Sequence, residues 1–149
     1  MTEPLVKEIT VPVSAKRAFD IFTRDIANWW PGASHSLSAS AHKLPRNISI
    51  TPKVGGAITE ELHDGTFANW GIISEWDVGK KLVFTWHLRR PEAEQTQVSV
   101  EFFPEGDKTR VRLMHWGWDS MGDDAASARE QYNSGWDFVL GDCYAMAAN

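Results

Sequence analysis

Six short stretches between residues 47 and 116 alternate apolar with polar side chains, and turn-forming residues separate them. Such alternation is typical of β-strands with one buried face, and Gly-Gly or Asp-Gly between two stretches favours a hairpin. The sequence therefore predicts an antiparallel meander. Its strands are expected at residues 47–51, 57–62, 67–76, 81–88, 96–103 and 109–116.

Further elements flank this meander on both sides. Residues 5–13 also alternate and predict an edge strand, and Ser14 then fits the N-cap of a helix over residues 15–24. A second short helix is expected to end before Pro31, because proline disrupts a helix that it interrupts. After the meander, apolar residues recur at spacings of three and four over residues 123–148, which predicts a long amphipathic helix.

The predicted order of elements is one strand, two short helices, six strands and a long helix. A sheet must bury one face, so we expect an α+β fold in which a curved antiparallel sheet packs around the C-terminal helix. The chain of 149 residues shows no repeat and no linker, and it predicts a single domain over residues 1–149. Residues 32–45, rich in Ser and Ala, predict a surface loop that acts as a mobile lid.

Charge and composition exclude several classes of function. The net charge of −5, without clustered Lys or Arg, disfavours nucleic acid as a partner. No apolar stretch approaches the roughly 18 residues needed to span a bilayer, so no membrane insertion is expected. The amino-terminal MTEPLVKEIT lacks a basic and then apolar leader, and the single cysteine, Cys143, fits a reducing compartment. The sequence therefore predicts a cytoplasmic protein.

Several motifs, in a fixed order along the chain, are similar to those of a known superfamily. They are Trp29-Trp30, Pro52-Lys53-Val54-Gly55-Gly56, Gly71 followed by Lys81-Leu82-Val83-Phe84-Thr85-Trp86, Thr109 to His115 with Gly117, and Gly135-Trp136. The ordered set resembles the helix-grip (START-like, SRPBCC) superfamily, and within it the AHSA-type branch, the homologues of the activator of the heat-shock chaperone ATPase. The superfamily also includes lipid-transfer domains, plant hormone receptors and polyketide cyclases.

The resemblance implies a helix-grip fold with an elongated apolar cavity between the sheet and the last helix. The eight tryptophans suit either such a pocket or a solid core, and both interpretations stay open. On the first interpretation, we expect a small apolar or aromatic molecule as the ligand, and no cofactor. The expected lining residues are Trp30, Phe67, Phe84, Trp86, His115 and Trp136.

Two other functions stay open. An enzyme of the polyketide cyclase or dehydratase type would need His115 beside an inward carboxylate, and Glu60 and Glu61 lie on opposite faces of one strand as candidates. His115 is otherwise a core histidine that is hydrogen-bonded to a neighbouring element. A chaperone-associated protein-interaction module would instead have a filled core and an exposed patch.

The sequence contains no recognisable catalytic or metal-binding motif. Its five histidines form no H-E-x-x-H motif, and no G-x-S-x-G is present. In eukaryotic members of the branch, chaperone activation is associated with an additional amino-terminal domain, for which 149 residues leave no room. Lys7 and Pro12 are typical of a protected sheet edge, so we expect a monomer or a weak homodimer.

Overall fold

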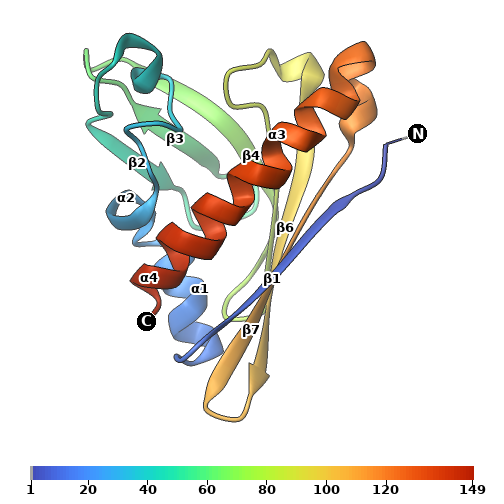
Figure 1. Cartoon of the computed structure of the whole chain (residues 1–149). Helices are drawn as coiled ribbons and strands as arrows, with labels where there is room; N and C mark the ends of the chain where they lie inside the picture. Colours follow the sequence, from blue (N-terminus) through green and yellow to red (C-terminus); the bar gives the residue numbers. More distant parts are fainter. Residues whose placement is uncertain (1) are drawn as a thin grey trace.

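The computed structural model describes residues 2–149 and has the expected α+β architecture (Figure 1). Within these residues, seven antiparallel strands form one sheet in the order β1-β7-β6-β5-β4-β3-β2. The strands are β1 (Leu5–Val11), β2 (Asn47–Ile50), β3 (Ala57–Glu61), β4 (Phe67–Asp77), β5 (Lys81–Trp86), β6 (Thr96–Glu105) and β7 (Lys108–Trp116). The α-helices are α1 (Ala15–Thr23), α2 (Ile26–Trp29), α3 (Ala125–Phe138) and α4 (Ala145–Ala147). The other helical turns are η1 (Ser38–Ala41), η2 (Glu92–Glu94), η3 (Trp118–Asp124) and η4 (Val139–Tyr144).

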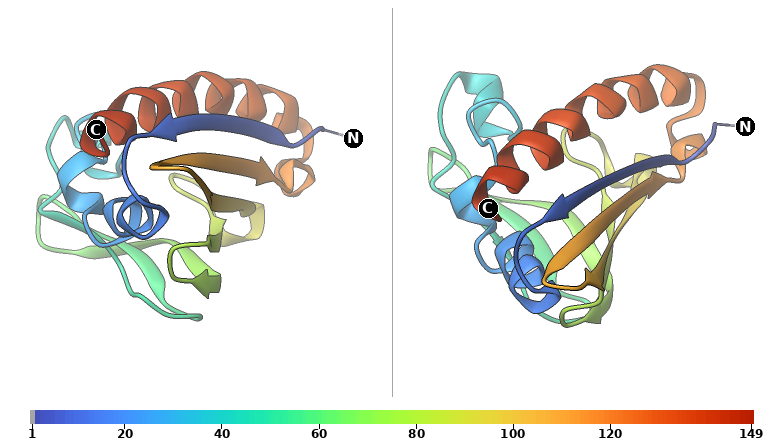
Figure 2. Two further views of the ribbon diagram at one scale, coloured as in Figure 1. Left: turned by 90° about the horizontal axis from the view of Figure 1, so that it is seen from below. Right: turned by 60° about the horizontal axis from the view of Figure 1, so that its bottom comes forward.

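The sheet curls around the C-terminal helix. In Figures 1 and 2 the helix that begins with α3 crosses the concave side of the sheet diagonally, and α1 and α2 lie near its C-terminal end. β1 pairs along its whole length with β7, from Leu5 opposite His115 to Val11 opposite Thr109. β1 and β2 therefore form the two edges of the sheet. The expectation of a monomer or a weak homodimer stays a prediction.

Two irregularities bend the sheet around β4. The pairing register shifts once between β3 and β4 and once between β4 and β5, and such bulges increase the local twist of a strand. Between the two shifts lies Gly71, where a Cβ atom would overlap the carbonyl oxygen of Thr85 on β5. A residue without a side chain is therefore needed for β4 and β5 to approach this closely.

The helix ends follow local sequence signals only in part. Ser14 caps α1, because its Oγ accepts a hydrogen bond from the N–H of Arg17 at 3.1 Å. The C-terminal helix, in contrast, is irregular. It begins from the 3₁₀ turns of η3 and contains the π-turn η4 within one helical run over residues 125–147. None of the helices within residues 2–149 is long and apolar enough to cross a membrane.

Two groups of aromatic rings form much of the core. The first, here called the α1 cluster, consists of Phe19, Phe22, Trp29, Trp76, Phe102 and Tyr144. The second, here called the tryptophan cluster, consists of Trp30, Trp70, Trp86 and Trp136. Trp29 and Trp30, with ring centroids 5.7 Å apart, join the two clusters. The core is therefore continuous from α1 to α3.

Candidate functional site

The tryptophan cluster fills most of the space between the sheet and α3. Trp30 follows α2, Trp86 ends β5 and Trp136 lies in α3, so elements far apart in sequence meet here. The centroid of the Trp30 ring lies 5.6 Å from that of Trp86 and 6.2 Å from that of Trp136. Between these rings an apolar recess of about 30 Å³ remains. The elongated cavity implied by the resemblance is thus reduced to a small recess, because indole rings occupy the interior.

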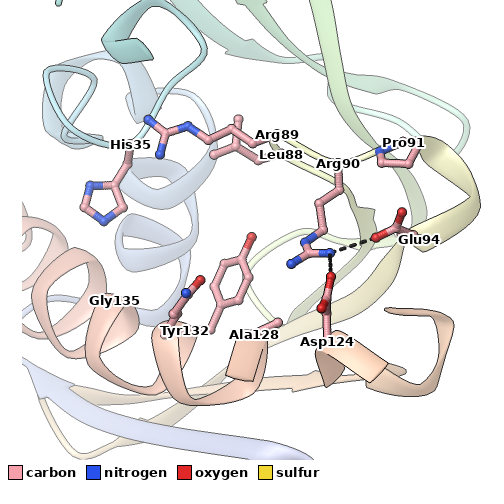
Figure 3. A pocket seen from close by; sticks show the side chains of 11 residues that line it. His35, Leu88, Arg89, Arg90, Pro91, Glu94, Asp124, Ala128, Tyr132 and Gly135 are labelled. Atoms are coloured by element: carbon pink, nitrogen blue, oxygen red, sulfur yellow. Dashed lines mark hydrogen bonds and ion pairs between the residues drawn. The ribbon is translucent and has the colours of Figure 1, made fainter. Parts of the chain in front are cut away.

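The recess opens into a larger cleft, shown in Figure 3. The cleft has a volume of about 530 Å³ and lies between the β5–β6 connection and α3. Recess and cleft share His35, Leu88, Tyr132 and Gly135 as lining residues. A volume of this size is typical of small-molecule sites. A flat molecule in the cleft can therefore reach the rings of the tryptophan cluster.

The rim of the cleft is polar. Arg90 Nη1 donates to Glu94 Oε1 at 2.7 Å and to Asp124 Oδ2 at 3.5 Å, so it links the β5–β6 connection to the start of α3. Deeper in the cleft, the Tyr132 hydroxyl oxygen accepts the Nε1–H of Trp86 at 3.0 Å. Burial raises the pKa of Tyr132, although the hydrogen bond from Trp86 opposes this shift. The phenol therefore stays protonated at neutral pH.

His115 is fully buried, and both of its ring nitrogens are occupied. Trp136 Nε1 donates to His115 Nδ1 at 3.0 Å, which places the imidazole proton on Nε2, 2.6 Å from Thr96 Oγ1. Burial lowers the pKa of His115 to about 3, so the ring is neutral at physiological pH. His115 thus has the partners expected of a core histidine, and neither nitrogen is free for a ligand.

Glu60 is the glutamate that points inward, and it fastens the loop over residues 32–45. Its carboxylate accepts the backbone N–H groups of Leu37 and Ser38 at 2.8 and 2.9 Å. It also accepts the Ser38 hydroxyl at 2.7 Å and the Trp70 Nε1–H at 3.2 Å. The structure therefore does not bring Glu60 and His115 together as an acid/base pair, because both groups are bonded elsewhere.

Arg89 holds the same loop from the side of the cleft. Its guanidinium donates to the carbonyl oxygens of Ser34 at 3.0 Å and Ser36 at 2.8 Å. The backbone of Arg89 has φ of 64°, a left-handed conformation that is costly for a residue other than glycine. The loop that we expected to be a mobile lid is thus bonded to the rest of the fold through both Glu60 and Arg89. Its serines, read from the sequence as surface residues, include the fully buried Ser36 and Ser38.

Five of the six predicted lining residues lie near one another. Trp30, Trp86 and Trp136 border the recess. Phe84 lies deeper, with its ring centroid 5.7 Å from that of Trp86, and His115 lies 6.1 Å from Trp136. The last two residues are buried in the core and line neither the recess nor the cleft.

Phe67 does not join this group, and its predicted place in the site needs correction. Its side chain is 72% exposed. β4 pairs with β3 so that Ala68 lies opposite the inward-pointing Glu60, and Phe67 lies opposite Glu61. Neighbouring side chains in a strand point to opposite faces. Phe67 therefore faces solvent, and Trp70 is the β4 residue that enters the cluster.

The lining residues predicted from the sequence did not include Tyr132, Leu88 and Arg90. Tyr132 precedes Trp136 by four residues and lies on the same helical face. The helical period therefore indicated that Tyr132 points toward the site. Leu88 and Arg90 follow the end of β5 in an irregular segment. No periodic pattern marks such positions, and their place in the site depends on the path of the chain between β5 and β6.

Possible metal ligands and the single thiol also bear on the chemistry of the site, and Cys143 lines neither the recess nor the cleft. Among residues 2–149, no group of three His, Cys, Asp or Glu side chains lies close enough to hold a metal ion. Burial raises the pKa of the Cys143 thiol, and the neighbouring Asp142 raises it further. A thiol with a raised pKa is a weak nucleophile at neutral pH.

Comparisons with known proteins place these features in context. A family model described as Activator of Hsp90 ATPase homolog 1-like protein matches residues 12–142. Among solved structures, the anthrahydroquino-gamma-pyrone synthase Txn09 is 28% identical, with a TM-score of 0.61 over 89% of this chain and 88% of that one. The self-sacrificing resistance protein CalC from Micromonospora echinospora is 26% identical, with a TM-score of 0.67 over 95% and 91%. The Aha1 dimer from Colwellia psychrerythraea shares the fold at 18% identity, with a TM-score of 0.65 over 99% and 97%. A search of curated proteins gave no significant match.

Proposed function

This chain belongs to the family of Activator of Hsp90 ATPase homolog 1-like proteins, and on that premise we propose that it binds a small apolar or aromatic molecule at the tryptophan cluster. One observation carries the proposal. An apolar recess between indole rings opens into a cleft of about 530 Å³ with a polar rim. Apolar walls with a few polar groups are the usual composition of small-molecule sites.

The proposed ligand lies flat between the β5–β6 connection and α3. Trp30, Trp86 and Trp136 form the floor of the site, and Leu88 forms one wall. His115 acts behind the floor, where its hydrogen bond holds the Trp136 ring in place. An aromatic ring gains about 0.5–1.5 kcal/mol from a suitably placed partner ring beyond the area that it buries. Several indole rings in one site therefore favour an aromatic ligand.

One solved structure, that of Txn09, supports this choice of ligand. Txn09 is named as a synthase of an anthrahydroquino-gamma-pyrone, a polycyclic aromatic compound, and CalC is named as a resistance protein. Both are more than 25% identical to this chain and match it over at least 89% of its length. We carry over the ligand class and not the reaction, because His115 and Glu60 are not arranged as a catalytic pair.

Gly135 offers a direct test. Apart from its two chain neighbours and the backbone of its own helix, a Cβ atom at Gly135 would meet no atom of residues 2–149 within 4 Å, and Gly135 lines both the recess and the cleft. Gly135→Leu should therefore fold and occupy the site. We expect native mass spectrometry to detect a co-purified small molecule in the parent protein and none in this variant. It should also lose binding of 2-naphthalenemethanol, measured by isothermal titration calorimetry.

Gly141 provides the matched control. It lies on the same helical run, and a Cβ there also meets no atom of residues 2–149 within 4 Å outside its chain neighbours and its own helix backbone. It lines neither the recess nor the cleft. Gly141→Leu should bind like the parent. Equal binding by the two leucine variants would contradict the placement of the site. The proposed function would be contradicted if the parent protein carried no bound molecule and bound none of a panel of aromatic compounds.

The family description supports a second candidate, a chaperone-associated interaction module. Such a module is expected to have a filled core, and the recess of about 30 Å³ between the indole rings is small. Stimulation of the ATPase of a purified Hsp90 by the parent protein, and by Gly135→Leu to the same extent, would favour this candidate. An unchanged ATPase rate would count against it.

A further inference from the structure

Two hydrogen-bond donors face the cleft beside the tryptophan cluster. The Tyr132 oxygen accepts the Nε1–H of Trp86, and its own proton has no acceptor among residues 2–149. Arg90 bonds carboxylates only through Nη1, which leaves the N–H groups of Nε and Nη2 without a partner among the same residues. Figure 3 shows the Tyr132 hydroxyl and the Arg90 guanidinium on the same hollow. Both groups can therefore donate to a molecule in the cleft.

We infer that the ligand is a planar aromatic acid, and that Tyr132 and Arg90 bind its anionic oxygen while its rings lie on the tryptophan cluster. This inference rests on the function proposed above. It adds the chemical class of the ligand and assigns its recognition to two residues that lie on α3 and on the β5–β6 connection.

The two hydrogen-bond donors, Tyr132 and Arg90, favour an anionic oxygen as their acceptor. A guanidinium can only donate, and a phenol whose oxygen already accepts one hydrogen bond is best used as a donor. Burial keeps the pKa of Tyr132 above its ordinary value, so its proton is present at neutral pH. Hydrogen bonds from an ionised donor to an ionised acceptor are about twice as strong as neutral ones. A carboxylate or phenolate oxygen therefore satisfies this pair better than an alcohol does.

The carboxylates of the rim compete with the ligand. Glu94 lies 2.7 Å and Asp124 3.5 Å from Arg90 Nη1, so both draw the guanidinium toward the mouth of the cleft. A ligand anion would share Arg90 with them. Weakening one of these ion pairs should therefore strengthen the binding of an anion and leave the binding of a neutral molecule unchanged.

A pair of probes with the same rings tests the inference: 2-naphthoate, which carries a carboxylate, and 2-naphthalenemethanol, which is neutral. Calorimetry on the parent protein should give about tenfold tighter binding of 2-naphthoate. Tyr132→Phe and Arg90→Met should each weaken 2-naphthoate by about tenfold and change 2-naphthalenemethanol by less than about twofold. Glu94→Gln should tighten only 2-naphthoate.

Arg110 supplies the matched control. It also bridges two carboxylates, Glu8 at 2.7 Å and Glu105 at 3.2 Å, but it does not line the cleft. Arg110→Met should bind both probes like the parent. Equal affinity of the parent for the two probes, or equal loss of both in Tyr132→Phe and Arg90→Met, would overturn the inference and leave the proposed function standing. Failure of both probes to bind the parent would overturn this inference, and the mass spectrometry and the compound panel described above would then decide the function.

Discussion

The indole N–H of Trp136 donates to Nδ1 of His115 across 3.0 Å, so a ring that borders the recess also sets the tautomer of a buried histidine. His115 Nε2–H then donates to the Thr96 hydroxyl, which donates to the carbonyl oxygen of Trp86 at 3.3 Å. This series of hydrogen bonds begins at Trp136 and ends at Trp86. His115 therefore braces two walls of the recess against each other.

The brace should make stability depend on pH. Burial lowers the pKa of His115 from 6.5 to about 3, so below pH 6.5 the unfolded chain binds a proton that the folded chain does not. His115 therefore lowers the free energy of unfolding as the pH falls from 6.5 toward 3, by up to about 1.4 kcal/mol per pH unit. Urea unfolding at pH 7, 6 and 5 should show a shallower loss for His115→Gln than for the parent protein. Parallel curves would contradict the assignment.

Removal of Glu60 should release the loop over residues 32–45. Glu60→Ala leaves the buried N–H groups of Leu37 and Ser38 without their acceptor, and each unsatisfied buried donor costs about 1–3 kcal/mol. We expect faster amide hydrogen exchange at both residues and a loss of about 3 kcal/mol in the free energy of unfolding. Glu61→Ala is the control, since Glu61 has only a 4.0 Å contact with Arg46. Similar exchange in the two variants would refute the role of Glu60.

Two substitutions at Arg89 separate its hydrogen bonds from its backbone conformation. Both Arg89→Ala and Arg89→Gly lose the bonds to Ser34 and Ser36. Only glycine adopts the φ of 64° without strain. Arg89→Gly should therefore be about 0.5–1 kcal/mol more stable than Arg89→Ala in urea unfolding. An alanine variant as stable as the glycine variant would show that the conformation carries no cost.

Two glycine positions should respond in opposite directions to alanine. Gly71→Ala places a Cβ against the Thr85 carbonyl oxygen, so we expect a loss of at least about 3 kcal/mol or failure to fold. Gly135→Ala adds a methyl group in open space on a helix and should gain about 0.5–1 kcal/mol. Thermal unfolding of both variants measures this difference. A stable Gly71→Ala protein would refute the close approach of β4 to β5.

The sequence predicted the elements of the fold well, because each is a local pattern. The alternation of the strands, the cap at Ser14 and the helical period near Trp136 are all visible within a few residues. The prediction that Phe67 lines the site was wrong, because nothing in the sequence showed which face of β4 turns inward. Its pairing with β3 decides that face.

Local patterns predicted the three indole rings that border the recess, Trp30, Trp86 and Trp136. Trp86 lies on a strand and Trp136 on a helix, so the period of each element indicated the face on which its ring lies. The contact of Glu60 with Ser38 joins residues 22 positions apart, and that of Arg89 with Ser36 joins residues 53 apart. Contacts of this range depend on the path of the loop. The sequence therefore suggested a mobile lid where the structure has a bonded loop.

The π-turn η4 has a consequence for the length of the C-terminal helix. Trp136 and Tyr144 contact different aromatic clusters and are eight residues apart. An α-helix turns about 100° per residue, so eight residues overshoot two full turns by about 80°. A π-turn takes in one extra residue and reduces this overshoot. Homologues with a regular helix should therefore be one residue shorter here, with the two aromatic positions seven apart. A single-residue gap at residues 139–144 in an alignment would then record a change in helical winding while both contacts persist.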